Sequence, residues 1–390
     1  MSKVYKKDFY NTFFLKNNIP NIYKNIRYSY RDGDFYINKK KQNNTLNKVS
    51  IVNLFPNYFY ANHLQEKKNI KKSIVQTKLN GYAVKLEDFL NIDSYLKSNF
   101  KSNTKSSIVK RKNRLESCFN VNYKMYFGEI LNEDYERIMV SLKNMLYKRF
   151  LQKKATNEFF DKWESYYSST IKLILNKEAS LFVIYANNII IGLSLNYHAK
   201  DIFIGHVIAY DINYSKFGIG NTIVFKLIEW CINNNYSILD MGNGDLDYKL
   251  NWSNYIYNYQ YHIVYRKNSI NSILKAYYAI FIIKLKNLLK NCNADIYLAL
   301  IKKKLLNNTI KENTFSNIKL EKVNKLPLSN LQETNYTDFK NESLTKSFID
   351  FVYLEQEYVS NIRTYKINER TYYYKSKSKI QKVELQLFNN

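Results

Sequence analysis

Glycine is scarce in this chain, and most of it lies in one segment that also carries a histidine, carboxylates, a tyrosine and a lysine. The 390 residues include nine glycines, and six of them lie between Gly192 and Gly244. Glycine permits positive φ and a close approach of the backbone to a ligand. We therefore interpret the segment as a binding site.

The first glycine pair, Gly218 and Gly220, stands immediately before an apolar segment with helical spacing over residues 222–233. The NH groups that open a helix have no intrahelical partner and lie at the positive end of its dipole. A glycine turn at this point predicts backbone binding of a pyrophosphate, as in an acyl-CoA site, with no need for a metal. The cofactor-binding candidates are Ile208, Lys216, Gly218, Ile219, Gly220 and Asn221.

The second glycine pair opens an expected loop, residues 242–249, that combines carboxylates, a phenol and an ammonium. Transfer of an acyl group to an amine needs a neutral nucleophile, an oxyanion stabiliser and a proton for the leaving thiolate, and these side chains can supply each role. His206 is a further candidate base because its unperturbed pKa lies near neutral pH, although a buried core histidine is the commoner role. A solvated turn is the competing interpretation of the loop. The catalytic candidates are His206, Asp247 and Tyr248, and the substrate-binding candidates are Tyr210, Asp211, Asn243, Gly244, Asp245 and Lys249.

The elements that must position these residues follow from periodicity. Apolar, β-branched segments predict strands over residues 180–186, 189–197, 202–210, 236–241 and 255–266. Helical spacing predicts helices over residues 86–100, 104–118, 134–153 and 157–175. An antiparallel meander therefore leads into the glycine turn and its helix.

This order resembles the Gcn5-related N-acetyltransferase (GNAT) superfamily, and within it the CelD/BioF2-like branch found in gene clusters for bacterial envelope polysaccharides. The resemblance covers residues 90–265 and includes a basic helical lead-in at 95–116. It is carried by Ala209-Tyr210-Asp211, Gly218-Ile219-Gly220, Glu229-Trp230, Leu239-Asp240 and the segment from Gly244 to Lys249. It implies an α+β fold with a mixed, mostly antiparallel sheet flanked by helices, a degenerate N-terminal half and a C-terminal extension. One departure is Ser215, with Lys216 beside it, where such folds usually carry Arg or Gln.

The chain divides into four expected parts. Residues 1–90 form an N-terminal α/β half-domain, and residues 91–266 form the acyltransferase domain. Residues 267–306 form basic amphipathic helices, the first of them over 270–290. Residues 307–390 form a C-terminal extension with β-like segments at 348–353 and 371–387.

Charge and cysteine usage limit the partners and the compartment. The chain has 60 basic and 33 acidic residues, a net charge of +27, which suits an anionic partner or reflects a Lys-rich genomic bias. The basic stretch from Lys101 to Arg114 is either a solvated helix face or a site for an anionic carrier. Three scattered cysteines give neither a disulfide framework nor a metal-site spacing, which favours the cytoplasm. The N-terminal residues show no signal-peptide pattern, and the longest apolar stretch, 276–283, is far short of the roughly 20 residues that span a bilayer.

These observations together predict an acyl-CoA-dependent N-acyltransferase whose acceptor is a small or carrier-linked amine. The resemblance adds acetyl-CoA as a donor and an amino sugar of an envelope-polysaccharide precursor as the acceptor. Two alternatives stay open. One is a transferase of the peptidoglycan-bridge type that takes an aminoacyl-tRNA donor, the one role in which we expect nucleic acid. The other is a non-enzymatic basic protein that binds nucleic acid or the inner face of the membrane. The sequence leaves the oligomeric state open.

Overall fold

The computed structural model describes residues 4–13, 18–29, 33–37, 49–63, 69–153, 158–244, 246–291, 317–327 and 330–386. The chain forms two compact units, each assembled from segments that are distant in sequence. The first unit comprises Met1–Asp88, Tyr197–His206 and Cys231–Thr309. The second comprises Phe89–Asn196, Val207–Trp230 and Ile310–Asn390.

The first unit is built on a sheet in which N-terminal strands lie among strands from residues 202–266. The strand order is β1-β4-β12-β6-β11-β10. The β1–β4 and β10–β11 pairs are parallel, whereas β12 and β6 pair antiparallel with their neighbours. A small sheet with the order β3-β2-β5 belongs to the same unit. The elements are β1 (Val4–Asp8), α1 (Phe9–Phe13), β2 (Tyr23–Tyr28), β3 (Asp34–Ile37), β4 (Val49–Pro56), β5 (Phe59–His63), β6 (Ile70–Lys85), β11 (Ile238–Asn243), α8 (Asp247–Trp252), β12 (Tyr255–Arg266) and α9 (Ile270–Asn291).

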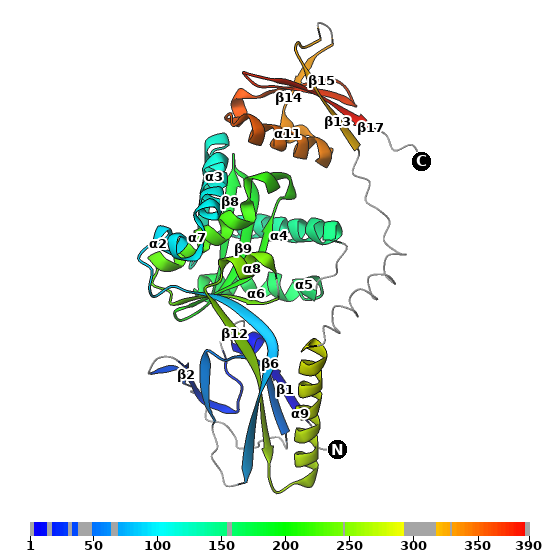
Figure 1. The fold of residues 1–390 in the computed structure, drawn as a ribbon. Helices are drawn as coiled ribbons and strands as arrows, with labels where there is room; N and C mark the ends of the chain where they lie inside the picture. Colours follow the sequence, from blue (N-terminus) through cyan, green and yellow to red (C-terminus); the bar gives the residue numbers. More distant parts are fainter. Residues whose placement is uncertain are drawn as a thin grey trace. The chain divides into compact units, whose positions relative to one another are not determined.

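Helix α9 packs along this sheet through a narrow face. Figure 1 shows it beside the long strands β6 and β12. Ala276 and Ile283 are buried against a cluster that includes Val49 and Ile263. The helix predicted over residues 270–290 is confirmed, and its opposite face leaves several large apolar side chains in solvent.

The second unit carries the expected meander, with the strand order β10-β9-β8-β7. Strand β8 reads ASLFVIYA and is buried at every position, as expected of an apolar strand covered on both faces. Strands β9 and β10 extend from this unit into the first. The elements are α2 (Ile92–Asn99), α3 (Ser102–Cys118), β7 (Val121–Tyr126), α4 (Asn132–Lys153), α5 (Glu158–Asp161), α6 (Trp163–Leu175), β8 (Ala179–Ala186), β9 (Ile189–Ala199), β10 (Ile202–Tyr210), the 3-10 helix η1 (Ile212–Phe217) and α7 (Ile219–Asn233).

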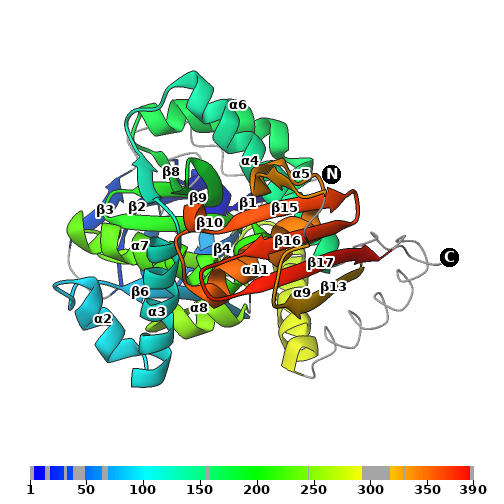
Figure 2. The ribbon, with the colours of Figure 1, turned by 90° about the horizontal axis from the view of Figure 1, so that it is seen from above.

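The C-terminal residues of the second unit form an antiparallel sheet in the order β13-β17-β16-β15-β14. Helix α11 covers one face of this sheet (Figure 2). On that face Phe348 and Phe351 contact the ring of Tyr374. The elements are β13 (Asn317–Val323), β14 (Gln332–Thr334), η2 (Tyr336–Asp338), α11 (Glu342–Glu355), η3 (Val359–Asn361), β15 (Arg363–Asn368), β16 (Thr371–Lys375) and β17 (Ile380–Gln386).

The expected strand at 348–353 is wrong, because these residues lie within α11. Leu344, Phe348, Phe351 and Val352 are buried at helical spacing, and Asn341 caps the helix by accepting from the Ser343 NH at 2.9 Å. A short apolar stretch does not by itself distinguish a strand from a helix. The expected strands within 371–387 are confirmed.

The predicted α+β class, with a mostly antiparallel sheet and flanking helices, is confirmed. Two local expectations need correction. The helix predicted over 86–100 is shorter, Ile92–Asn99, because Asn91 forms a capping box with Ser94. The loop predicted over 242–249 turns into α8 at Asp247. The second helical stretch expected before residue 306 lies outside the described residues. Within the described part of the chain, no helix is long and apolar enough to cross a membrane.

Candidate functional site

The glycine turn lies between η1 and α7. Gly218 closes η1 with φ +71°, in the left-handed region that favours glycine, and its NH donates to the Ser215 carbonyl at 3.0 Å. Thr222 then donates to the Gly218 carbonyl at 3.1 Å, which is the first hydrogen bond of α7. The NH groups that open α7 precede this bond and lie at the positive end of a 15-residue helix.

Gly220 allows an aromatic ring to approach the turn. A Cβ at this position would lie 3.3 Å from Cε1 of Tyr210, a close contact. The sequence predicts that the missing side chain at Gly220 makes room for a ligand, and in the structure the Tyr210 ring lies on that side of the backbone. The guanidinium of Arg149, from α4, lies 5.7 Å from the centre of the same ring.

Asp211 fixes the start of η1. Its carboxylate accepts from the Asn213 NH at 2.9 Å. Burial raises the pKa of this carboxyl, against the opposing effects of the Asn213 hydrogen bond and of Lys148. Asp211 therefore has a defined backbone role beside its predicted role in substrate binding.

The C-terminal helix α11 contacts η1 directly. Lys216 forms an ion pair with Asp350 at 3.2 Å, and Asp350 also pairs with Lys346 at 3.2 Å. The rings of Phe217 and Tyr353 meet edge to face at 5.0 Å between centres. Lys216, a predicted cofactor-binding residue, is thus paired with a carboxylate of the C-terminal extension.

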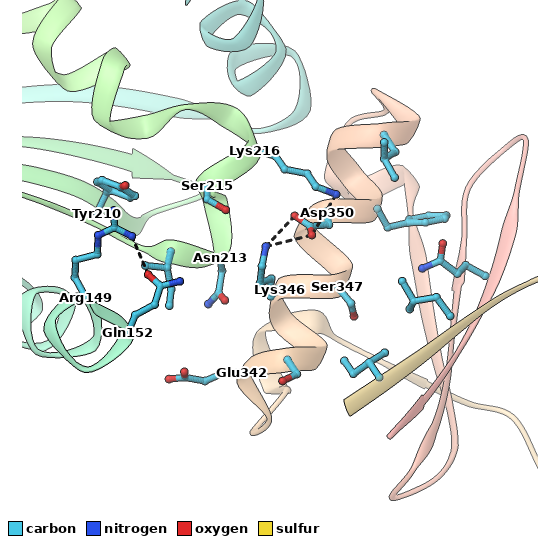
Figure 3. Close-up of a pocket in the computed structure, with 17 residues that line it drawn as sticks. Arg149, Gln152, Tyr210, Asn213, Ser215, Lys216, Glu342, Lys346, Ser347 and Asp350 are labelled. Carbon is cyan, nitrogen blue, oxygen red and sulfur yellow. Dashed lines mark hydrogen bonds and ion pairs between the residues drawn. The ribbon is translucent and has the colours of Figure 1, made fainter. Parts of the chain in front are cut away.

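A pocket of about 480 Å³ lies where α4, η1 and α11 meet. Figure 3 shows Arg149 and Gln152 from α4 on one side, and Lys346, Ser347 and Asp350 from α11 on the other. Tyr210, Asn213, Ser215 and Lys216 complete the polar lining, and apolar residues including Ile318, Leu320 and Phe351 add the rest. Charged groups of both signs next to apolar surface suit a polar small molecule.

Helix α3 supplies a cation next to the turn. The Cδ atom of Arg111 is 3.2 Å from where a Cβ on Gly218 would lie. The family pattern places an Arg or Gln at the position of Ser215, which is exposed here. The Arg111 guanidinium, from α3, thus lies near the glycine turn, which has Ser215 where the family pattern has Arg or Gln.

In the first unit, Lys249 forms a hydrogen bond with the backbone of the second glycine loop. Its ammonium donates to the Asn243 carbonyl at 2.5 Å, and the residue is only 8% exposed. Gly244 has φ +102°. This contact is made to the protein's own backbone, so the substrate-anchoring role of Lys249 stays a prediction.

The neighbours of Lys249 in α8 differ in environment. Asp247 is exposed, whereas burial raises the pKa of the Tyr248 hydroxyl to about 12. A phenol with this pKa is protonated at neutral pH, as an acid for a leaving thiolate needs to be. Asp245 lies outside the described residues.

Beneath this loop lies a buried polar cluster that sequence analysis did not anticipate. The Asp240 carboxylate accepts from the hydroxyls of Tyr58 at 2.7 Å and Tyr257 at 2.8 Å, and from the Gly242 NH at 2.6 Å. Tyr257 also shares a hydrogen bond of 2.8 Å with Tyr259. Burial raises the pKa of Asp240, while these hydrogen bonds and Lys249 act in the opposite sense. Asp240 stands out in the sequence as a carboxylate within an apolar strand. Its partner Tyr58 could not be inferred, because it lies 182 residues away in sequence.

His206 is half-buried, and its ring packs edge to face with that of Tyr197 at 5.3 Å. With Asn243, Gly244 and the α8 residues it belongs to the first unit. Ile208, Tyr210, Asp211, Lys216 and the turn residues 218–221 belong to the second unit. The assigned roles of all these residues remain predictions. Within the described ranges, no three His, Cys, Asp or Glu side chains are arranged to hold a metal ion.

Comparison with known families identifies the segment that contains the glycine turn. Residues 102–250 match the family described as "Acetyltransferase (GNAT) domain". The chain therefore carries an acyltransferase domain of the GNAT type, as predicted. This makes the protein an acyltransferase enzyme, with an acyl-CoA as the substrate that the domain implies. No curated protein matches the sequence.

The solved structures to which this chain is similar have low sequence identity with it. A conserved protein of unknown function from Bacteroides thetaiotaomicron is 10% identical with a TM-score of 0.38, over 55% of this chain and 69% of that chain. FemX is 10% identical with a TM-score of 0.36, over 47% of this chain and 61% of its own. An aminoglycoside acetyltransferase from an uncultured soil metagenomic sample is 17% identical with a TM-score of 0.26, over 34% of this chain and 84% of its own.

Proposed function

We propose that the protein transfers an acyl group from acyl-CoA to an amine, with the donor's pyrophosphate at the glycine turn. The observation that carries this proposal is the Gly218 turn, in which a left-handed glycine opens a helix beside the guanidinium of Arg111. The opening NH groups, the helix dipole and a nearby cation all favour an anion.

In the proposed reaction the amine nitrogen attacks the thioester carbonyl. A C–N bond forms, the C–S bond breaks, and the amine gives up one proton. His206 and Asp247 are the candidates to accept that proton. Tyr248, which is protonated at neutral pH, is the candidate to donate one to the CoA thiolate.

Calorimetric titration of acetyl-CoA into two glycine variants tests the placement of the donor. Gly218→Ala forces a side chain into φ +71°, and Gly128→Ala does the same at φ +87° on the segment between β7 and α4. Each should cost about 1–2 kcal/mol of stability. Only Gly218→Ala should weaken acetyl-CoA, by about tenfold or more. Equal affinities in both folded variants would remove the donor from this turn.

The acceptor that we favour is an amino sugar of an envelope-polysaccharide precursor, in line with the CelD/BioF2-like resemblance. The mixed-charge pocket beside Tyr210 supports a polar, small or carrier-linked acceptor. Release of free thiol from acetyl-CoA in the presence of a panel of amino sugars and other amines measures this directly. A rate no higher than that of buffer hydrolysis with every amine would count against it.

The tRNA-dependent alternative is supported by the net charge of +27. The dependence of binding affinity on the logarithm of salt concentration distinguishes this alternative, because binding to a nucleic acid releases many counterions. Titration with tRNA at several salt concentrations should give weak binding if acyl-CoA is the donor. Tight, steeply salt-dependent binding by a protein that ignores acetyl-CoA would favour the tRNA donor or a nucleic-acid-binding protein.

We further propose peripheral contact with an anionic membrane surface through α9, in a protein otherwise in the cytoplasm. Leu274, Tyr277 and Phe281 are 62%, 53% and 61% exposed along one side of the helix. The helix also carries lysines and no acidic residue. Exposed apolar side chains with basic neighbours are typical of interfacial helices. The wild-type protein should pellet with phosphatidylglycerol vesicles on sedimentation, and a Leu274→Ser/Phe281→Ser variant should stay in the supernatant. Equal pelleted fractions of the two proteins would exclude this surface.

A further inference from the structure

One face of α3 carries cations that have no carboxylate partner among the described residues. A pocket of about 420 Å³ is lined by this face and by Tyr353 of α11. The lining residues from α3 are Asn103, Ser106, Ser107, Lys110, Arg111 and Arg114. They include three cations, two hydroxyls and an amide, and no carboxylate.

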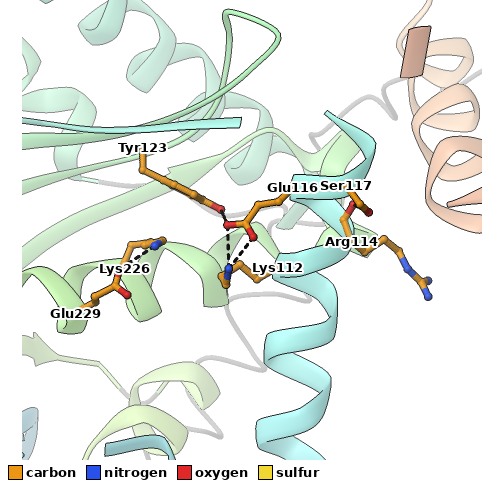
Figure 4. Close-up of polar contacts among 7 residues, drawn as sticks. All are labelled: Lys112, Arg114, Glu116, Ser117, Tyr123, Lys226 and Glu229. Carbon is orange, nitrogen blue, oxygen red and sulfur yellow. Dashed lines mark hydrogen bonds and ion pairs between the residues drawn. The ribbon is translucent and has the colours of Figure 1, made fainter. Parts of the chain in front are cut away.

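On another side of α3, a cation does have a carboxylate partner. Lys112 pairs with Glu116 at 2.7 Å, and Glu116 also accepts from the Tyr123 hydroxyl at 3.0 Å. Figure 4 shows this group on one side of the helix and Arg114 pointing away from it. Glu116 is the sole acid of the helix, so the opposite face keeps its positive charge. Across the described residues, no carboxylate forms an ion pair with Lys110 or Arg111.

Two contacts fix the position of this pocket. The Arg114 guanidinium lies over the Tyr353 ring at 4.4 Å from its centre, which orients one cation against α11. Arg111 lines the pocket and also packs on Gly218. The pocket therefore adjoins the glycine turn.

We propose that this pocket binds a phosphate group separate from the one at the turn. Lysine and arginine side chains grouped with hydroxyl and amide donors recognise phosphate oxygens through charge-assisted hydrogen bonds. A doubly charged phosphate would also neutralise cations that now repel one another. A phosphate in this pocket and a pyrophosphate at the turn could belong to one ligand, since CoA carries both a pyrophosphate and a ribose 3′-phosphate. The phosphate could instead belong to a phosphorylated acceptor.

The experiment compares three probes: CoA, 3′-dephospho-CoA and inorganic phosphate. Each is titrated by calorimetry into the full chain and into a Lys110→Gln/Arg114→Gln variant. The matched control is Lys112→Gln, which removes one positive charge from the same helix outside the pocket. If the donor supplies the phosphate, wild type should bind CoA about tenfold or more tightly than dephospho-CoA. The double variant should lose this preference, and the control should keep it.

The remaining outcomes separate the two sources and the two proposals. Equal binding of CoA and dephospho-CoA, with inorganic phosphate bound by wild type and lost in the double variant, assigns the pocket to the acceptor. The part of the inference that names CoA rests on the proposed function. If neither form of CoA binds but inorganic phosphate still depends on Lys110 and Arg114, the proposed donor fails and the phosphate pocket stands. If the double variant binds all three probes as the wild type does, the pocket is not a phosphate site.

Discussion

Replacing Gly220 by Val should reveal the contact between the glycine turn and Tyr210. A Cβ at this position would lie 3.3 Å from the ring, and valine adds two methyl groups beyond it. Overpacking of this kind costs about 1–3 kcal/mol. The better helix preference of valine returns less than about 1 kcal/mol. We therefore expect a net loss of about 1–2 kcal/mol in the free energy of unfolding.

A double-mutant cycle with Tyr210→Ala assigns that loss to the ring. In the Tyr210→Ala background the space is open, so Gly220→Val should be nearly neutral or slightly stabilising. The coupling energy should then be about 1–3 kcal/mol, well above the roughly 0.3–0.5 kcal/mol within which distant sites add. Urea unfolding, followed by circular dichroism, gives the four free energies.

Calorimetry with acetyl-CoA on the same four proteins adds a functional test. If the NH groups at the turn hold the pyrophosphate, Gly220→Val should weaken acetyl-CoA in both backgrounds. Additive free energies of unfolding would refute the close contact between Gly220 and Tyr210. Full recovery of affinity in the double variant would show that the ring, and not the backbone, governs donor binding.

Three further perturbations address other parts of the protein. Tyr248→Phe should lower turnover by about tenfold to a hundredfold with unchanged acetyl-CoA affinity, because it removes the proposed proton donor; steady-state kinetics with full activity would exclude that role. Burial lowers the pKa of His198 to about 3, so the unfolded chain takes up a proton first as pH falls below about 6.5. At pH 5 this should cost roughly 2 kcal/mol of stability relative to neutral pH, and urea unfolding of His198→Gln should lack that component. Removal of residues 307–390 should lower the thermal midpoint, because Phe217 loses its contact with α11 and Cys118 Sγ loses its contact with the Val352 carbonyl; an unchanged midpoint in calorimetry would make the extension separable.

The local features of the second unit follow from the pattern of residues along the chain. Glycine at positions 218 and 220 before an apolar helical pattern located the turn and α7, because backbone conformation and helix opening depend on neighbouring residues. Alternation and apolar composition predicted the meander from β8 to β10, because these patterns also depend only on neighbouring residues. Strand β6 was not anticipated, although its exposed and less exposed positions alternate, because lysines and polar residues occupy much of it.

Which of these features lie together depends on contacts between residues that are distant in sequence. Arg111 reaches Gly218 from a helix more than a hundred residues earlier, and Asp350 holds Lys216 from the C-terminal extension. Tyr58 completes the hydrogen bonds of Asp240 across 182 residues. A periodic pattern states which face of an element is apolar, but many faces are apolar and many surfaces are basic. Tertiary packing determines which of these faces meet. The contact energy depends on shape and on the pairing of buried polar groups, and local sequence spacing encodes neither.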